Sequence, residues 1–388
     1  MFELNNKERK YFGLKPVPKS WQKINFKGDA LRPDSILYYD GDIIKRQIIS
    51  TDTDYEEKQY EEFTKNQFTL LPKTDRGKER KLTSAVLEKC TPIDTYVKIK
   101  NDKTIIIGNH STQRTFYSSE FDKTLNGGIE SVKQIVFNYI ESCPSNYFDE
   151  IDNFNSEKRK NNKYKEGDFF RFKINRSLYG FGRILLDIST LRKNKIIDKK
   201  HGLNDLMGPP VLIKLYAILS ENKNLDIEYI KKQISLPSSY IMDNHIFYGD
   251  YEIIGNLKLE NNELDFPISY GRRIDQNHNF VFFQWGLIHL ELPLTEFSKY
   301  LNDDKTVLRS NPYKNSAIGY SPTFGVNDIR SALAGDNVYK TSSHWLTKLD
   351  LRNPVNEDIK NEIMIKFGLN PALDYFRNSE IADAINIF

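Results

Sequence analysis

The sequence predicts an α+β protein of at least two domains with a β-rich central part. Several short runs alternate between apolar and polar residues, as half-buried strands do. Helical spacing of apolar residues is confined to a few segments that do not alternate regularly with these strands. A doubly wound parallel sheet is therefore the weaker alternative. The length of 388 residues exceeds one ordinary core, since domains usually contain about 100–200 residues.

Residues 1–155 are predicted to form an N-terminal α+β domain. Asp40-Gly-Asp and Asn101-Asp are turn signals between apolar runs and predict hairpins. The expected strands are 35–39, 43–49, 95–100 and 104–107. The charged run 56–65 is expected to be a short exposed helix, and 129–141 an amphipathic helix. Between them, 74–81 is a basic, turn-rich loop.

Residues 164–301 are predicted to form a β-rich central domain, after a polar linker at 156–163. The expected strands are 170–174, 179–188, 211–219, 251–255 and 280–288, followed by a short helix at 291–301. Gly180 and Gly182 lie within one of these strands and predict that it bends. A strongly curved sheet or a small barrel is the expected form.

Residues 302–388 are predicted to be a mainly helical C-terminal segment. One helix is expected at 326–334 with Asn327 as its cap. A second is expected at 357–367, because Ile359, Ile363 and Phe367 share a face and Gly368 follows as a C-cap.

The composition excludes several classes of protein. The formal net charge is +3, and neither half of the chain is strongly basic, which argues against a dedicated nucleic-acid-binding module. Two cysteines, Cys90 and Cys143, are too few for a secreted disulfide scaffold. No apolar run suits a signal peptide or a membrane span. We therefore expect a cytoplasmic protein that binds neither nucleic acid nor membrane.

No catalytic residue, cofactor or metal site is predicted. The six histidines include no pair four residues apart, and there is no Cys-x-x-Cys motif. Gly180 and Gly182 form a G-x-G that continues as a strand, so no helix N-terminus faces a phosphate. Cys90 follows Lys89, which could lower the thiol pKa, but no partner base is in view. There is also no G-x-S-x-G nucleophile elbow.

A metal-dependent nuclease is the enzymatic alternative. Asp34 together with Glu79 and Lys81 loosely resembles the residues that hold Mg²⁺ beside an attacked phosphate. Such a site needs its Glu and Lys on one rigid strand. Here both residues lie in a charged run without strand alternation, which argues against the alternative.

Aromatic and arginine residues beside glycines form the candidate partner-binding set, since Tyr, Trp and Arg dominate protein interfaces. The binding candidates are Tyr179, Arg183, Tyr270, Arg272 and Arg273. The residues assigned to the structural motif are Gly180, Gly182, Gly271 and Trp285. Arg272 and Arg273 point to opposite sides of an extended chain, so one of them would be available to a partner carboxylate.

These same motifs carry a resemblance to a known family. The run Gly167-Asp-Phe-Phe-Arg-Phe-Lys-Ile, followed by Tyr179-Gly-Phe-Gly-Arg-Ile-Leu, resembles the opening of the immunity protein 26 family. Pro267-Ile-Ser-Tyr-Gly-Arg and Phe283-Gln-Trp-Gly-Leu resemble its later strands. The resemblance covers about 164–293 and implies a mostly β fold without an assigned active site. It also implies a bacterial immunity protein of a polymorphic toxin system, which binds and neutralises a cognate toxin.

Overall fold

The computed structural model describes residues 2–119, 128–272, 279–301, 326–336, 339 and 350–386. Within these residues the protein contains sheets and helices, which confirms the predicted α+β class. The chain divides into two compact units, each described by itself below. Unit 1 comprises Met1–Asn162, Lys173–Leu178 and Phe247–Tyr251, and unit 2 comprises Lys163–Phe172, Tyr179–Ile246 and Glu252–Phe388. The three-part division expected from the sequence stays a prediction.

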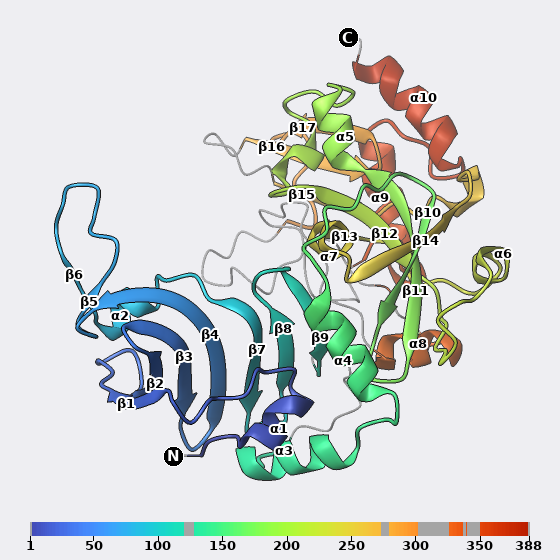
Figure 1. Cartoon of the computed structure of the whole chain (residues 1–388). Coiled ribbons are helices and arrows are strands. Elements are labelled where there is room, and N and C mark those ends of the chain that lie inside the picture. Colours follow the sequence, from blue (N-terminus) through green and yellow to red (C-terminus); the bar gives the residue numbers. More distant parts are fainter. Residues whose placement is uncertain are drawn as a thin grey trace. The chain divides into compact units, whose positions relative to one another are not determined.

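Unit 1 is built on one broad antiparallel sheet (Figure 1). The strands in spatial order are β1 (Gln22–Phe26), β2 (Ser35–Asp40), β3 (Ile43–Ser50), β4 (Asp54–Lys65), β7 (Ile93–Lys100), β8 (Ile105–Asn109) and β9 (Arg114–Ser118). The short strands β5 (Thr69–Leu70) and β6 (Arg80–Lys81) extend from β4. Both predicted hairpins are confirmed, since β2 pairs with β3 and β7 pairs with β8.

The prediction of a helix at 56–65 is wrong, because these residues form most of strand β4. Alternate side chains of its first half face the core, and Glu57 is among them with no exposed surface. Its Oε1 accepts hydrogen bonds from Arg9 Nε at 2.8 Å and Arg46 Nη1 at 2.6 Å. The charged residues that indicated a solvated helix therefore include the acidic centre of a buried ion cluster.

The helices of unit 1 are α1 (Asn6–Tyr11), α2 (Ser84–Leu87), α3 (Val132–Glu141) and α4 (Tyr147–Ser156). The predicted amphipathic helix is confirmed as α3, which begins where the Ser131 hydroxyl accepts the backbone N–H of Gln134 at 3.2 Å. Apolar side chains of α3 and α4, such as Ile135 and Ile151, share one core with strand residues such as Val97. Helix α4 was not predicted.

Unit 2 contains a five-stranded and a three-stranded sheet. The strands of the first, in spatial order, are β13 (Ser239–Met242), β12 (Pro210–Leu215), β11 (Tyr179–Asp187), β10 (Asp168–Lys173) and β14 (Tyr251–Asn256). Those of the second are β15 (Ile268–Arg272), β16 (Phe280–Trp285) and β17 (Ile288–Pro293). In the described residues the five-stranded sheet ends at β13 and β14, and no closed barrel is found.

Unit 2 also contains helical elements. They are α5 (Ile188–Lys193), η1 (Gly202–Asp205), α6 (Ile227–Lys231), α7 (Asn244–Tyr248, whose last two residues lie in unit 1), η2 (Asn261–Glu263), α8 (Val326–Leu333), η4 (Pro354–Asn356), α9 (Glu357–Lys366) and α10 (Tyr375–Asn386). Helix α9 confirms the predicted helix, and Gly368 follows it with φ of +77°. Helix α8 includes Asn327, which is therefore not its cap. None of the helices in the described residues is long and apolar enough to cross a membrane.

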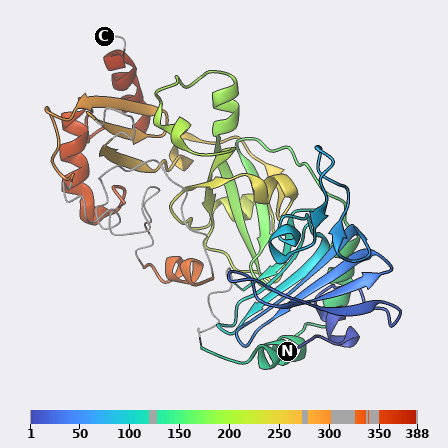
Figure 2. The same cartoon turned by 90° about the vertical axis from the view of Figure 1, so that its left-hand side faces the viewer.

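The expected helix at 291–301 is wrong, and the expected strand at 280–288 is two strands. Gly286 has φ of +58°, which turns the chain between β16 and β17. Residues 288–293 therefore pair back on β16 as a strand. Figure 2 shows this three-stranded sheet (orange) beside helices α9 and α10 (red). Phe283 of β16 and Phe367 at the end of α9 belong to the core between them.

Gly182 on β11 occupies a position where a side chain has no room. A Cβ built there would lie 2.3 Å from Phe170 Cζ and 2.7 Å from Leu215 Cδ2. Both neighbours are buried, at 0% and 3% exposed, so they have little freedom to move away. Close packing of strands β10 and β12 against β11 therefore requires glycine at this position.

We expect Gly182→Val to destabilise the protein by about 1–3 kcal/mol, because overpacking forces its neighbours to shift. Thermal unfolding followed by circular dichroism would show a lower Tm. Gly128→Val is the control, since a Cβ at Gly128 meets only the end of Lys103, at 3.6 Å. Equal melting of parent, Gly182→Val and Gly180→Val would show that the glycines of β11 are not structural.

Candidate partner-binding site

The candidate residues of strand β11 face largely inward. Tyr179 at its start is half-buried, and from Gly180 to Leu186 the strand is buried. The backbone of Tyr179 pairs with Ser220 on a neighbouring loop. Among the β11 candidates, Tyr179 alone therefore presents part of its side chain to solvent.

Arg183 is fully buried, and its guanidinium is surrounded by acceptors of unit 2. Nη1 donates to the Glu263 carboxylate, and Nη2 donates to the carbonyl oxygens of Leu257 at 2.6 Å and Lys258 at 3.2 Å. The guanidinium also lies 4.5 Å from the ring centroid of Phe169. These contacts join β11 to the segment between β14 and β15, so Arg183 supports the unit from within.

Two lysines complete the electrostatic surroundings of Glu263. Lys214 Nζ lies 3.9 Å from its Oε1, and Lys231 Nζ lies 3.9 Å from its Oε2. Burial lowers the pKa of Lys214, while the attraction of Glu263 opposes this shift. The hydrogen bond from Lys231 to Glu260 raises the pKa of Lys231. One buried carboxylate is thus balanced by Arg183 and two neighbouring cations.

The second group of candidates lies on β15 and β16. Tyr270 is buried at 1% exposed, and its hydroxyl donates to the carbonyl oxygen of Lys299 at 2.8 Å. Trp285 is half-buried and makes an edge contact with Tyr375, with ring centroids 5.2 Å apart. Gly271 is buried and Arg272 is half-buried at the end of β15. Arg273 lies outside the described residues.

The structure therefore separates the predicted set by accessibility. Arg183 and Tyr270 belong to the interior of unit 2, whereas Tyr179, Arg272 and Trp285 keep part of their surface exposed. The prediction that these residues bind a partner stays a prediction.

A pair of imidazoles in unit 2, buried His201 and half-buried His289, was missed by the sequence reasoning. The rings of His201 and His289 have centroids 5.3 Å apart. His201 Nδ1 accepts the backbone N–H of Leu203 at 3.2 Å, so its Nε2 donates to the carbonyl oxygen of Leu287 at 3.0 Å. Burial lowers the pKa of His201, against weaker opposing effects of Leu287 and Asp198. No local pattern marked the pair, because its members are far apart in the sequence.

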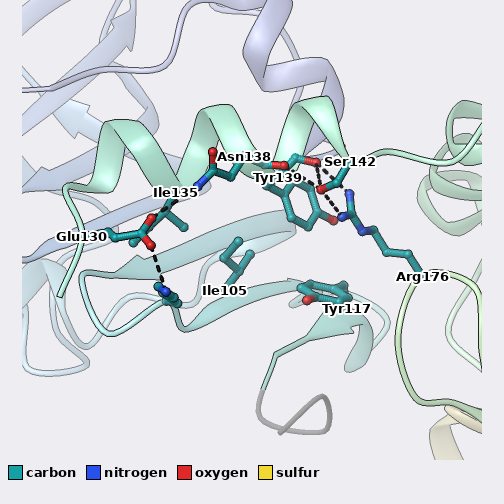
Figure 3. Close-up of a pocket in the computed structure, with 9 residues that line it drawn as sticks. Ile105, Tyr117, Glu130, Ile135, Asn138, Tyr139, Ser142 and Arg176 are labelled. Carbon is teal, nitrogen blue, oxygen red and sulfur yellow. Dashed lines mark hydrogen bonds and ion pairs between the residues drawn. The ribbon is translucent and has the colours of Figure 1, made fainter. Parts of the chain in front are cut away.

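Unit 1 has a pocket of about 200 Å³ between α3 and strands β8 and β9. Figure 3 shows Arg176 at one end, pointing toward Tyr139 and Ser142. Its guanidinium donates to the carbonyl oxygen of Tyr139 at 2.7 Å and to the Ser142 hydroxyl at 2.6 Å. At the other end Glu130 pairs with Lys103 at 2.9 Å. These charged groups already form hydrogen bonds or ion pairs with other residues of unit 1. The pocket therefore has apolar side chains at its floor and polar groups with hydrogen-bond partners at its rim.

The residues of the nuclease alternative lie on exposed parts of unit 1. Asp34 accepts the backbone N–H of Gly28 and the ammonium of Lys27, both at 2.9 Å. Glu79 pairs with Lys73 at 3.4 Å in the loop before β6. Among the described residues, no group of three or more His, Cys, Asp or Glu side chains is placed to hold a metal ion.

The thiol of Cys90 is buried, as expected for a cysteine without a partner base. Burial raises the pKa of Cys90 to about 11, so the adjacent Lys89 does not produce a reactive thiolate. Burial also raises the pKa of Cys143.

Comparison with known proteins identifies one part of the chain. Residues 165–279 match the family model of Immunity protein 26. No curated protein and no solved structure in the comparisons matches the chain. The predicted resemblance is therefore confirmed for the central segment, from β10 to β15, and the match ends before β16. This match relates the central segment to the Immunity protein 26 family.

We expect Arg183→Met and Glu263→Gln each to reduce the free energy of unfolding by about 3–5 kcal/mol, because each leaves a buried charge without its main partner. Chemical denaturation would measure this loss, and the double variant should lose less than the sum. Arg377→Met is the control, since its pair with Glu380 is exposed at 66% and 69% and should contribute about 0–1 kcal/mol. Equal losses in all three single variants would contradict a special role for the buried pair.

We also expect the neutral His201 to make stability depend on pH. Its pKa is lower in the folded than in the unfolded chain, so the folded state binds fewer protons. The contribution is complete above the unfolded pKa of about 6.5 and is lost as the pH falls through the folded pKa. The difference in Tm between the parent and His201→Asn should therefore be larger at pH 8 than at pH 5. An unchanged difference at the two pH values would refute this assignment.

Proposed function

We propose that this chain is an immunity protein that binds a cognate bacterial toxin and neutralises it, and so protects the cell that produces it. The observation that carries this proposal is the match of residues 165–279 to the family model of Immunity protein 26. In this proposal the chain acts in the cytoplasm as a binding protein and has no catalytic role.

Two features of the structure support a binding role. The residues of the nuclease alternative, Asp34 and Glu79, are each paired with a lysine and lie on loops rather than on one rigid strand. In unit 2, the buried pair of Arg183 with Glu263 fixes a sheet without offering its charges to a substrate. A rigid framework of this kind reduces the conformational entropy that a protein loses on binding a partner.

The partner-binding role of individual residues is part of the proposal. Tyr179 at the start of β11 and Arg272 at the end of β15 retain exposed surface. Arg273 follows Arg272 directly in the sequence. Arg183 and Tyr270 would act indirectly, by holding β11 and β15 in place. The bend that Gly180 and Gly182 predict for the central sheet would then shape the surface that meets the toxin.

The test is protection in living cells. We expect co-expression of this chain to restore growth to bacteria that produce the toxin domain encoded beside its gene, and the two purified proteins to form a stable complex. A folded but unrelated protein is the control in the growth assay. Failure of every neighbouring toxin domain to bind or to be neutralised would refute the proposal. Magnesium-dependent cleavage of DNA or RNA by the purified chain, lost in Asp34→Ala or Glu79→Ala, would favour the nuclease instead.

A further inference from the structure

The connection from α5 to β12, residues 188–209, exposes large apolar side chains in the family-matched part of unit 2. Ile196 is 60% exposed and Met207 is 77% exposed. Met242 of β13 is 42% exposed and lies beside Gly208, the residue after Met207, because a Cβ at Gly208 would lie 3.0 Å from its Cε. We call Ile196, Met207, Met242 and the lysines described below the α5–η1 surface. A contiguous group of exposed apolar side chains with a polar rim marks an interaction site.

The exposure of these side chains follows from firm anchoring of their neighbours. Ile197 and Leu206 are 8% and 3% exposed, and both belong to the core that includes residues of β11 and β12. Because they hold the chain from inside, the adjacent Ile196 and Met207 face outward. The connection is therefore not a loosely attached loop.

The side chain of Arg192 fixes the same connection by hydrogen bonds to backbone carbonyl groups. Its guanidinium donates to the carbonyl oxygens of Leu203, of Leu206 at 2.6 Å and of Gly208 at 2.9 Å. His201 adds its hydrogen bond to the carbonyl oxygen of Leu287 at 3.0 Å. A surface fixed in this way before binding loses little conformational entropy when a partner docks.

The charges around the apolar side chains favour one kind of partner. Four exposed lysines lie in this connection, namely Lys193, Lys195, Lys199 and Lys200. The connection contains two carboxylates, and one of them, Asp198, accepts the backbone N–H of Lys200 at 2.6 Å. The excess of positive charge is complementary to an acidic surface, and such complementarity accelerates association and excludes wrong partners.

The apolar part of the surface favours a protein over a nucleic acid. Ile196, Met207 and Met242 are aliphatic or thioether side chains, and methionine adapts readily to protein surfaces. Single-stranded nucleic acids are usually bound by aromatic side chains on which the bases stack. The chain's net charge of +3 also lacks the basic excess typical of nucleic-acid binders.

We propose that the α5–η1 surface contacts an acidic face of the cognate toxin, with Ile196, Met207 and Met242 at the apolar centre and the lysines at the rim. This inference rests on the proposed function and names the surface that performs it. It also adds to the Tyr179 and Arg272 candidates a surface whose apolar and charged groups are directly exposed.

The experiment measures the affinity of full-length variants for the toxin domain encoded beside the gene. We expect Ile196→Ser/Met207→Ser, and separately Lys193→Glu/Lys199→Glu/Lys200→Glu, to weaken binding by at least about tenfold. The lysine variant should also reduce the dependence of the association rate on salt. Melting temperatures should stay close to that of the parent, since the substituted side chains are exposed.

Matched controls come from exposed residues of unit 1. They are Ile129→Ser, at a side chain that is 86% exposed, and Lys19→Glu/Lys133→Glu/Lys158→Glu, at three exposed lysines. Binding of each variant to a short DNA duplex is measured in parallel. Loss of DNA binding in the lysine variant, with unchanged toxin affinity, would overturn the proposal in favour of a nucleic acid.

The result also separates the inference from the function on which it rests. If the parent neutralises the toxin and the α5–η1 variants bind as tightly as the parent, this surface is not the interface, although the immunity function stands. If the parent itself fails to bind or neutralise any neighbouring toxin, the proposed function fails and the inference falls with it.

Discussion

The architecture of unit 2 depends on the need to satisfy one buried cation. Arg183 has no exposed surface, so its guanidinium must find acceptors within the protein. Glu263 and the carbonyl oxygens of Leu257 and Lys258 provide them, which draws the segment between β14 and β15 against β11. Gly182, the preceding residue, lets β10 and β12 pack closely on the same strand. On β11, Gly182 thus determines how closely the strands of the five-stranded sheet pack. Its neighbour Arg183 determines the position of the segment between β14 and β15.

Local periodicity predicted those parts of the fold in which alternate residues differ in polarity. The hairpins of β2 with β3 and of β7 with β8 follow from such patterns and from turn residues between them, and the strands β10 and β11 were also predicted. The pattern failed for β4, because Glu57 faces the core and pairs there with Arg9 and Arg46. A charged residue normally indicates an exposed position. The burial of such a residue becomes evident only when the structure shows an oppositely charged partner beside it. Strand β17 was missed because the turn at Gly286 lies inside an apolar run.

The candidate site was harder to predict than the fold, since it depends on which side chains reach the surface. Sequence reasoning selected Arg183 and Tyr270 by residue type, and the structure places both in the interior. It did not select Ile196 or Met207, because an apolar residue beside Ile197 or Leu206 has no local signal that distinguishes outside from inside. The family resemblance, by contrast, was recognisable from contiguous strand motifs and needed no knowledge of exposure.

The buried ion cluster of unit 1 also constrains how related sequences can diverge. Glu57 accepts hydrogen bonds from Arg9 on α1 and Arg46 on β3, so two arginines share one carboxylate in the core. Replacing Glu57 alone leaves the buried Arg46 without a carboxylate partner, whereas replacing all three with apolar residues of similar volume can be neutral. Homologues of this unit should therefore vary at positions 9, 46 and 57 in concert, and the cluster should persist or disappear as a whole during evolution.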